Sequence, residues 1–243
     1  MRVVYDEQIF AMQRYGGISR YFARIAEELA VHPEIETEIV APLHINAYLD
    51  DCKTANVRGL ALKPSRFSRR AARIAGQLLA GPASAILKPD IVHETYYRSG
   101  PRKARSCPTV LTVYDMIHEL FPESFPESDM TMARKRDAVL NADHVICISE
   151  NTKRDLTRLI PEATLKTSVV LLGFDPPRGT ITDERPHSKP YLLYVGDRGG
   201  YKNFALLIEA VAEDPGLADL DIGCFGGGLL GSDVIALIRK HGV

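Results

Sequence analysis

Several side chains that can exchange protons gather where two predicted strands end. They are His93, Glu94, Asp115, His118 and Glu119. The strands are expected over residues 89–94 and 109–113, and ligands of open α/β sheets bind outside the carboxyl ends of strands. Imidazole and carboxylate groups in that place can act as general acids and bases. We therefore take His93, Asp115 and His118 as candidate catalytic residues, while noting that a histidine in such a place is more often structural.

A second candidate site is the stretch Tyr191–Phe204, YLLYVGDRGGYKNF. Its apolar start predicts a buried strand, and the glycine-rich turn that follows leads into a helix start. A helix N-terminus presents unpaired N–H groups and a positive dipole, so it suits a phosphate. Arg198 and Lys202 would add two cations there. The alternative is an ordinary strand-to-helix turn with two solvated cations.

A glycine pair near the other end of the chain strengthens the phosphate interpretation. Gly16 and Gly17 follow a predicted first strand over 2–5 and a loop over 13–17. They directly precede an amphipathic helix, whose apolar stripe is Ile18, Phe22, Ile25 and Leu29. A glycine lets a ligand approach the backbone closely. A plain turn remains the alternative, because a glycine pair alone is weak evidence.

The elements that position these residues alternate between strands and helices. Further strands are expected over 37–41, 143–148, 167–172 and 219–225, and helices over 130–140, 150–159 and 232–239, whereas 47–62 shows no pattern. Ser149 is a good N-cap for the helix over 150–159. The alternation predicts an α/β fold with a parallel, doubly wound sheet. We expect a Rossmann-like N-terminal domain over 1–175, a linker over 176–190 with four prolines, and an incomplete second Rossmann-like domain over 191–243.

One predicted helix, over 67–87, differs from the rest in its charge. Arg66, Arg69, Arg70 and Arg73 precede the apolar residues Ile74, Leu78, Leu79, Ile86 and Leu87. A basic amphipathic helix can lie on an anionic membrane surface. The alternative, which we favour on the sequence, is a solvated arginine face above a packed apolar one. Gly81-Pro82 is expected to end or kink the helix.

Composition excludes several classes of protein. The 243 residues are 45% hydrophobic and 25% charged, as in ordinary globular proteins, and the formal net charge of −1 does not indicate a nucleic-acid partner. Four scattered cysteines argue against structural zinc and fit a reducing cytoplasm. There is no signal pattern and no apolar run of the roughly 20 residues that span a bilayer. We therefore expect a cytoplasmic protein that can associate peripherally with the inner face of the membrane through the four arginines.

Six segments, taken in order, resemble the family 4 retaining glycosyltransferases of the GT-B fold. They are QRYGGISRYF (Gln13–Phe22), PDIVHETYY (Pro89–Tyr97), VLTVYDMIHELFPESF (Val110–Phe125), ADHVICISENTKRDL (Ala142–Leu156), LLYVGDRGGYKNFALLIEA (Leu192–Ala210) and CFGGG (Cys224–Gly228). Each is modest alone, but the ordered set is specific and spans most of the chain. The resemblance is greatest to bacterial mannosyltransferase-like enzymes of surface-polysaccharide assembly.

The resemblance implies an enzyme with two Rossmann-like domains that transfers a hexose with retention. The donor would be a nucleotide-diphosphate sugar, and the acceptor a glycan or polyprenyl-linked molecule bound by the N-terminal domain. Gly16 and Gly17 match the family's glycine pair at the donor diphosphate. Arg198 and Lys202 match the cationic pair that neutralises the diphosphate as it leaves. No metal or other cofactor is expected, which suits the absence of a DxD pattern.

The chain also departs from the family pattern. Tyr114-Asp115 stands where the family commonly has His-Asp, and the family's cleft histidine maps to His93 or, two positions later, to Thr95. The two glutamates that hold the donor would lie beyond residue 243. A non-catalytic acceptor-binding module is therefore the alternative function. A dinucleotide-dependent oxidoreductase is a weaker one, because the first strand is not followed by GxGxxG.

Overall fold

The computed structural model describes residues 1–98, 107–174 and 187–242. The chain divides into two compact units, one formed by Met1–Leu120 with Ser128–Phe174 and the other by Phe121–Glu127 with Asp175–Val243. Most of the linker predicted over 176–190 lies outside the described residues.

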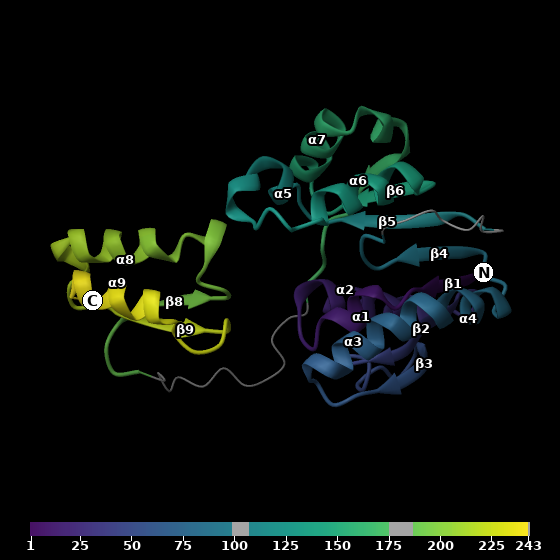
Figure 1. Cartoon of the computed structure of the whole chain (residues 1–243), viewed down its shortest axis with the longest axis horizontal. Coiled ribbons are helices and arrows are strands. Elements are labelled where there is room, and N and C mark those ends of the chain that lie inside the picture. Colours follow the sequence, from purple (N-terminus) through teal and green to yellow (C-terminus); the bar gives the residue numbers. More distant parts are fainter. Residues whose placement is uncertain (99–106, 175–186, 243) are drawn as a thin grey trace. The chain divides into compact units, whose positions relative to one another are not determined.

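The first unit is built on a seven-stranded sheet in which every neighbouring pair of strands is parallel. Its strands are β1 (Arg2–Tyr5), β2 (Glu36–His44), β3 (Asn56–Ala61), β4 (Ile91–Glu94), β5 (Thr109–Val113), β6 (His144–Cys147) and β7 (Thr167–Val169). Their order is β3-β2-β1-β4-β5-β6-β7, which can be followed from β3 to β6 in Figure 1. The predicted parallel, doubly wound α/β fold is confirmed.

Helices connect these strands. They are α1 (Gln8–Met12), α2 (Gly17–Ala30), α3 (Arg66–Ala75), a π-helical turn (Gly76–Ala80), α4 (Gly81–Ile86), α5 (Ile117–Leu120), α6 (Thr131–Asn141) and α7 (Glu150–Leu159). The side chain of Ser149 accepts a hydrogen bond from the Thr152 amide, so the predicted N-cap of α7 is confirmed. The amphipathic helix predicted after Gly17 is α2.

Alternation along β1 shows how the sheet is covered on both faces. Val3 and Tyr5 pack with Phe22 of α2 in one buried cluster. Val4, which points to the opposite face, packs with Ala80 of the π-helical turn. A third cluster lies under α6 and α7 and includes Leu111, Val113, Val139, Val145, Cys147 and Leu156. Side chains of successive residues in a strand point to opposite faces, so a parallel strand covered on both faces is apolar throughout.

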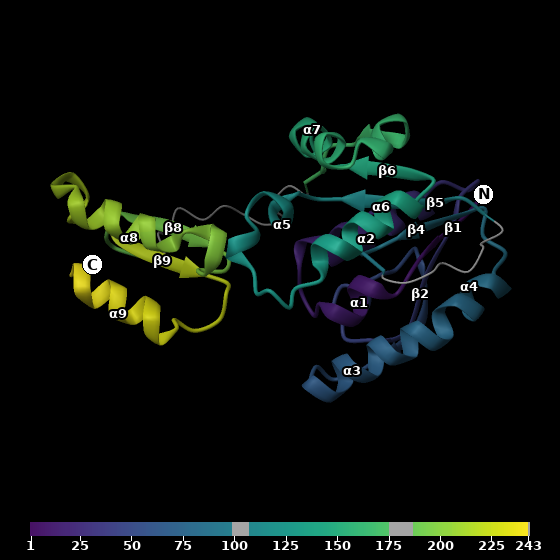
Figure 2. The ribbon, with the colours of Figure 1, turned by 45° about the horizontal axis from the view of Figure 1, so that its top comes forward.

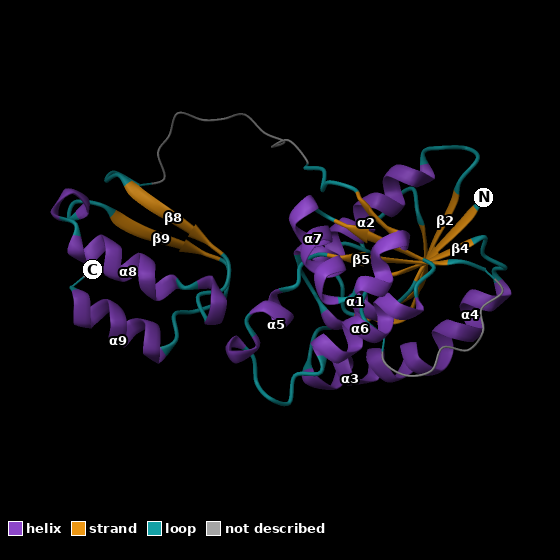
Figure 3. Ribbon diagram, turned by 90° about the horizontal axis from the view of Figure 1, so that it is seen from above, coloured by secondary structure: helices purple, strands orange, loops and turns teal. Residues whose placement is uncertain are grey.

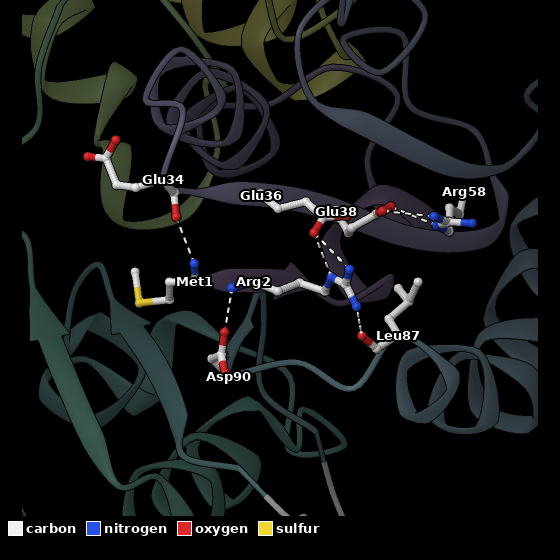
Figure 4. Close-up of polar contacts among 8 residues, drawn as sticks. All are labelled: Met1, Arg2, Glu34, Glu36, Glu38, Arg58, Leu87 and Asp90. Carbon is white, nitrogen blue, oxygen red and sulfur yellow. Dashed lines mark hydrogen bonds and ion pairs between the residues drawn. The ribbon is translucent and has the colours of Figure 1, made fainter.

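Polar contacts of Arg2 join three strands at the amino end of the sheet (Figure 4). Its guanidinium donates to Oε2 of Glu36 in β2, with Nη2 at 2.7 Å, and also to the carbonyl of Leu87. Its backbone amide donates to Oδ2 of Asp90, just before β4, at 2.6 Å. These contacts fix the positions of β2 and β4 on either side of β1.

The edge of the sheet differs from the prediction at two places. β2 was expected to end before Pro42, but it continues to His44, and its register with β3 shifts between Val40 and Leu43. Proline has no N–H to donate, and an irregularity in the ladder accommodates that loss. β3 itself had no predicted pattern. It is an exposed edge strand anchored by Arg58, whose Nε and Nη2 donate to the carboxylate of Glu38 at 2.7 and 2.8 Å (Figure 4).

The second unit contains a parallel pair of strands, β8 (Tyr191–Val195) and β9 (Asp221–Phe225), with helices α8 (Phe204–Glu213) and α9 (Ser232–His241). Figure 3 shows both helices on the same side of the strands. The strand predicted over 191–195 is confirmed as β8, but its predicted burial is wrong, since Leu193 and Val195 remain 60% and 66% exposed. Alternate residues of β8 face away from the helices, and the described residues supply no layer on that side.

The basic segment forms the helix that was predicted, with a π-helical turn directly before Gly81-Pro82. The expectation that its large apolar residues pack inward is confirmed only for Leu87, which is buried with Val4 and Val92. Elsewhere small residues pack, among them the fully buried Ala72, whereas Phe67 and Ile86 are 87% and 80% exposed. Among the described helices, none combines the length and the apolar character that a membrane span requires.

Candidate functional site

The centre of the large sheet is a topological switch point. The chain moves from β1 outward to β2 on one side and from β4 outward to β5 on the other, and β1 and β4 are neighbours. In open α/β sheets, ligands bind at such a point, outside the carboxyl ends of the strands. Asp6 and Glu7 follow β1 there, and His93, Glu94 and Thr95 lie at the end of β4.

Asp6 and Thr95 connect the ends of the two central strands. Oδ1 of Asp6 accepts hydrogen bonds from the amide and the hydroxyl of Thr95, at 2.9 and 2.6 Å. The Thr95 hydroxyl oxygen in turn accepts one from the amide of Ile9 in α1. Both side chains are buried. The backbone at the switch point is therefore held rigidly by buried hydrogen bonds.

The buried Glu7 forms an ion pair with the partly buried Arg98 beside this connection. Nη2 of Arg98 lies 2.7 Å from Oε1 of Glu7 and 3.6 Å from Oδ2 of Asp6. Burial raises the pKa of Glu7, and the negative charge of Asp6 raises it further. Oε2 of Glu7 has no hydrogen-bond partner among the described residues, and a cavity of about 30 Å³ adjoins the pair. A cavity of this size has room for a water molecule.

His93 lies in the core between β4 and α2. Its ring packs against the rings of Tyr5 and Phe22, at centroid distances of 5.5 and 5.0 Å, and Nε2 lies 2.9 Å from Oγ1 of Thr112. Burial lowers the pKa of His93 to about 4, so the imidazole is neutral near pH 7. Its surroundings are those of a structural histidine. Its predicted catalytic role remains a prediction.

Asp115, His118 and Glu119 lie together after β5, as their spacing suggested. Asp115 is half exposed, and its Oδ1 accepts the amide hydrogen of Ile117 at the start of α5. Nε2 of His118 lies 3.6 Å from Oδ2 of Asp129. This group of side chains is separate from His93, whose contacts are all in the core. Asp115 is the predicted acid–base residue that solvent reaches most easily.

Lys135 of α6 belongs to the same group and was not among the predicted site residues. Its ammonium donates to Oε2 of Glu119 at 2.8 Å and to the backbone carbonyl of Asp115 at 2.9 Å. It also lies 5.6 Å from the centroid of the Tyr97 ring, within the range of a cation–π contact. A signal was present in the sequence, because Lys135 stands in an apolar stripe with Ala138, Val139 and Ala142. A lysine at such a position requires a buried partner.

Gly16 and Gly17 form the N-terminal end of α2, as predicted. A Cβ atom at Gly16 would lie 2.1 Å from Oε1 of Gln13, whereas one at Gly17 would meet nothing within 4 Å. The helix has no side-chain cap, and the amides of Gly17 and Ile18 have no hydrogen-bond partner in the part of the chain that the structure describes. Open space beside free N–H groups can accommodate an anion.

Arg198 spans the two glycine turns of the second unit. Its guanidinium donates to the carbonyls of Gly226, Gly227, Gly228 and Leu229, at distances from 2.6 to 3.3 Å. Gly226, Gly227 and Gly228 all have positive φ angles, which L residues rarely adopt. In this structure Arg198 therefore stabilises the turn after β9. Its predicted contact with a phosphate remains a prediction.

Lys202 stands at the end of the turn that follows β8. Its Nζ lies 5.1 Å from the centroid of the Tyr201 ring, and no carboxylate lies within ion-pair distance of it among the described residues. The next residue, Asn203, has a φ of 49° and begins α8. The ammonium group is therefore available to an anionic ligand. Across the described ranges, no group of three or more His, Cys, Asp or Glu side chains could hold a metal ion.

Comparisons with known proteins agree with this architecture. The family model described as Glycosyltransferase Family 4 matches residues 15–178. No curated protein matches the chain. One similar solved structure is a glycosyltransferase from Rickettsia africae ESF-5, with a TM-score of 0.58 and 18% identity over 99% of this chain. Another is the apo form of the lipopolysaccharide outer core galactosyltransferase WaaB, with a TM-score of 0.52 and 16% identity over 100% of this chain. In both cases the match covers 65% of the other chain.

Proposed function

The chain belongs to glycosyltransferase family 4, and from this premise we propose that it transfers a hexose from a nucleotide-diphosphate sugar to a glycan or lipid-linked acceptor. The observation that carries the proposal is the family match over 15–178, which includes the start of α2 and the carboxyl ends of β4 and β5. The chain spans about two thirds of the length of the solved structures that it matches, 65% of each. We further propose retention of the anomeric configuration, a mannose donor and a role in surface polysaccharide synthesis.

Each unit, taken by itself, has one feature that supports our assignment of a diphosphate-binding group. In the second unit, Lys202 offers an ammonium without an ion-pair partner in the described ranges. In the first unit, Gly17 offers an open helix N-terminus. Fixed positive groups of this kind stabilise the negative charge that develops on the leaving diphosphate. Arg198 would contribute only after it leaves the carbonyls that it holds in this structure.

The acid–base chemistry is assigned to the group after β5. Asp115 is half exposed, and its backbone carbonyl accepts a hydrogen bond from the ammonium of Lys135. His118 lies in the same turn and is less exposed. The burial of His93 supports a positioning role, since its ring orders the ends of β4 and β5 through Thr112. The acceptor is assigned to the first unit.

One observation favours the alternative of a non-catalytic acceptor-binding module. All four described partners of the Arg198 guanidinium are backbone carbonyls of residues 226–229. Because its N–H groups donate to these carbonyls, the guanidinium does not offer them to a phosphate in this structure. A module of this kind would bind a glycan or a lipid-linked sugar without transferring anything to it.

Calorimetric titration with GDP-, UDP- and ADP-sugars tests the donor site. We expect one of the three to bind, and Lys202→Ala to weaken that binding about tenfold or more, because one charge-assisted phosphate contact is lost. Lys240→Ala, which removes an exposed lysine from α9, is the matched control. Equal affinities of the Lys202→Ala and wild-type chains would contradict the assignment of Lys202.

A transfer assay separates the two functions. An enzyme releases nucleoside diphosphate when donor and acceptor are both present, and Asp115→Asn should slow that release with little change in donor affinity. Binding of an acceptor glycan together with no release by the wild-type chain would support the binding module instead.

A further inference from the structure

The outward face of the helical stretch from Arg66 to Ile86 carries large apolar side chains. Figure 2 shows α3 and α4 as parts of one long helical stretch along the first unit. Its inward face consists of small residues at intervals of four, Ala72, Gly76 and Ala80, all buried. Phe67, Leu78 and Ile86 on the outward side are 87%, 68% and 80% exposed. The stretch therefore packs through its small residues and leaves its large apolar ones in water.

The same stretch carries an unbalanced positive charge. Between Lys63 and Lys88 there are six basic residues and no acidic one, whereas the whole chain has a formal net charge of −1. The basic residues are Lys63, Arg66, Arg69, Arg70, Arg73 and Lys88. None of the four arginines forms an ion pair within the described ranges of the chain, and all four are exposed. The described carboxylates thus do not neutralise these guanidinium groups.

We propose that this face, defined by Phe67, Leu78, Ile86 and the four arginines, binds the surface of an anionic lipid bilayer. Guanidinium groups pair with lipid phosphates, while apolar side chains enter the boundary between headgroups and acyl chains. Exposed arginines and exposed large apolar side chains both occur along this one helical stretch. The proposal does not rest on the transferase activity, because it uses none of the residues assigned to that site.

Charge and apolar character together distinguish a bilayer from other anionic partners. A nucleic acid would use the arginines, but its phosphate backbone offers no apolar layer for Leu78 and Ile86. A bilayer interface offers anionic headgroups and hydrocarbon at adjacent depths. Phe67 and Arg70 are neighbours at i and i+3 on the outward side of α3, so they would reach both layers from one turn of helix.

Co-sedimentation with vesicles tests the charge requirement. The wild-type chain should sediment with vesicles of phosphatidylcholine mixed with phosphatidylglycerol and not with phosphatidylcholine alone. Substitution of Arg69, Arg70 and Arg73 by Ser should abolish this binding. The control carries Arg136→Ser, Arg154→Ser and Arg158→Ser, which remove three exposed arginines from α6 and α7. Loss of binding in both variants, or in neither, would overturn the proposal.

A fluorescence experiment tests the apolar requirement. The chain has no tryptophan, so Phe67→Trp introduces a single reporter on this face, and Leu165→Trp introduces one at a fully exposed site elsewhere. Anionic vesicles should shift the emission of the first to shorter wavelength and leave that of the second unchanged. An unshifted Phe67→Trp spectrum in a vesicle-bound chain, or a gel shift with RNA without vesicle binding, would overturn the proposal.

Discussion

The ammonium of Lys135 lies 2.8 Å from Oε2 of Glu119, and only 1% of the lysine side chain and 10% of the glutamate side chain remain exposed. Two elements that are separate in the sequence, α5 and α6, are joined by this pair. Such a pair contributes little net stability over an apolar replacement, but removal of one partner leaves the other charge buried and uncompensated.

Glu119→Gln should therefore lower the free energy of unfolding by about 3 kcal/mol, because the Lys135 ammonium loses its carboxylate partner. Lys135→Met should cost a similar amount, because Glu119 is then left without its cation. The double variant Lys135→Met/Glu119→Gln should lose much less than the sum of the two single losses, because neither charge is then left buried without its partner. Urea unfolding of the four proteins measures the coupling. Additive single effects would contradict the pairing.

The second prediction concerns the pH dependence of stability through His93. Its pKa is about 4 in the folded chain and about 6.5 when unfolded, so the unfolded state binds the extra proton between these values. The contribution of His93 to the free energy of unfolding is fully present above pH 6.5. It decreases by up to about 3 kcal/mol as the pH falls toward 4. Wild-type and His93→Gln chains should therefore differ progressively less in stability on acidification.

Comparison of the two proteins at each pH is essential, because Glu7 acts in the opposite direction. Its pKa is raised in the folded chain, so its protonation favours folding as the pH falls. That contribution is common to both chains and cancels in the difference. A stability difference between wild type and His93→Gln that stays constant from pH 7 to 4 would show that His93 is not buried as a neutral ring.

The third prediction concerns the contact between Arg198 and the glycine turn. Arg198→Ala removes four hydrogen bonds to the carbonyls of residues 226–229, so protease cleavage in that turn should be faster by about tenfold. Gly227→Ala should loosen it too, because the added Cβ would lie 2.6 Å from the Gly196 carbonyl oxygen. Arg239→Ala in α9 is the control. Unchanged cleavage in Arg198→Ala would mean that the turn holds its shape without the guanidinium.

The fourth prediction concerns thiol reactivity. Cys224 in β9 is exposed, whereas burial raises the pKa of Cys52 to about 11 and that of Cys147 to about 12. The thiolate is the reactive form, so Cys224 should react with a disulfide reagent in native protein well before these two. Loss of the fast phase in Cys224→Ser, and its persistence in Cys52→Ser, would confirm the order. Cys107 is also free and is partly exposed, so a fast phase that survives in Cys107→Ser/Cys224→Ser would contradict it.

Regular patterns in the sequence predicted the elements that pack on both sides of the sheet. The stripe that contains Phe22 follows from one periodicity, and the cap at Ser149 follows from one residue type. α1 and β3 were missed for a physical reason. α1 has five residues, too few to show a helical period, and β3 is an exposed edge strand with little apolar character.

Contacts between distant segments account for the parts of the site that were not predicted. Asp115 and Glu119 are close in sequence, so their proximity could be expected, but Lys135 reaches them from another helix. The partners of Arg198 lie about thirty residues further on, at separations of 28 to 31. No local pattern reports such a contact. Most large apolar residues of the basic helix were wrongly predicted to be buried. Periodicity shows which residues share one face of a helix, but it does not show which face packs against the sheet.

The position of β1 in the interior of the large sheet, between β2 and β4, also affects folding during synthesis. β1 contains residues 2–5, yet it needs β2 on one side and β4, which ends at residue 94, on the other. Until β4 has been synthesised, one edge of β1 has no strand to pair with. Parallel pairings over such long separations form slowly and leave nascent chains exposed to aggregation. Until residue 94 has been translated, the edge of β1 that will face β4 therefore presents unpaired N–H and C=O groups with which another chain could pair.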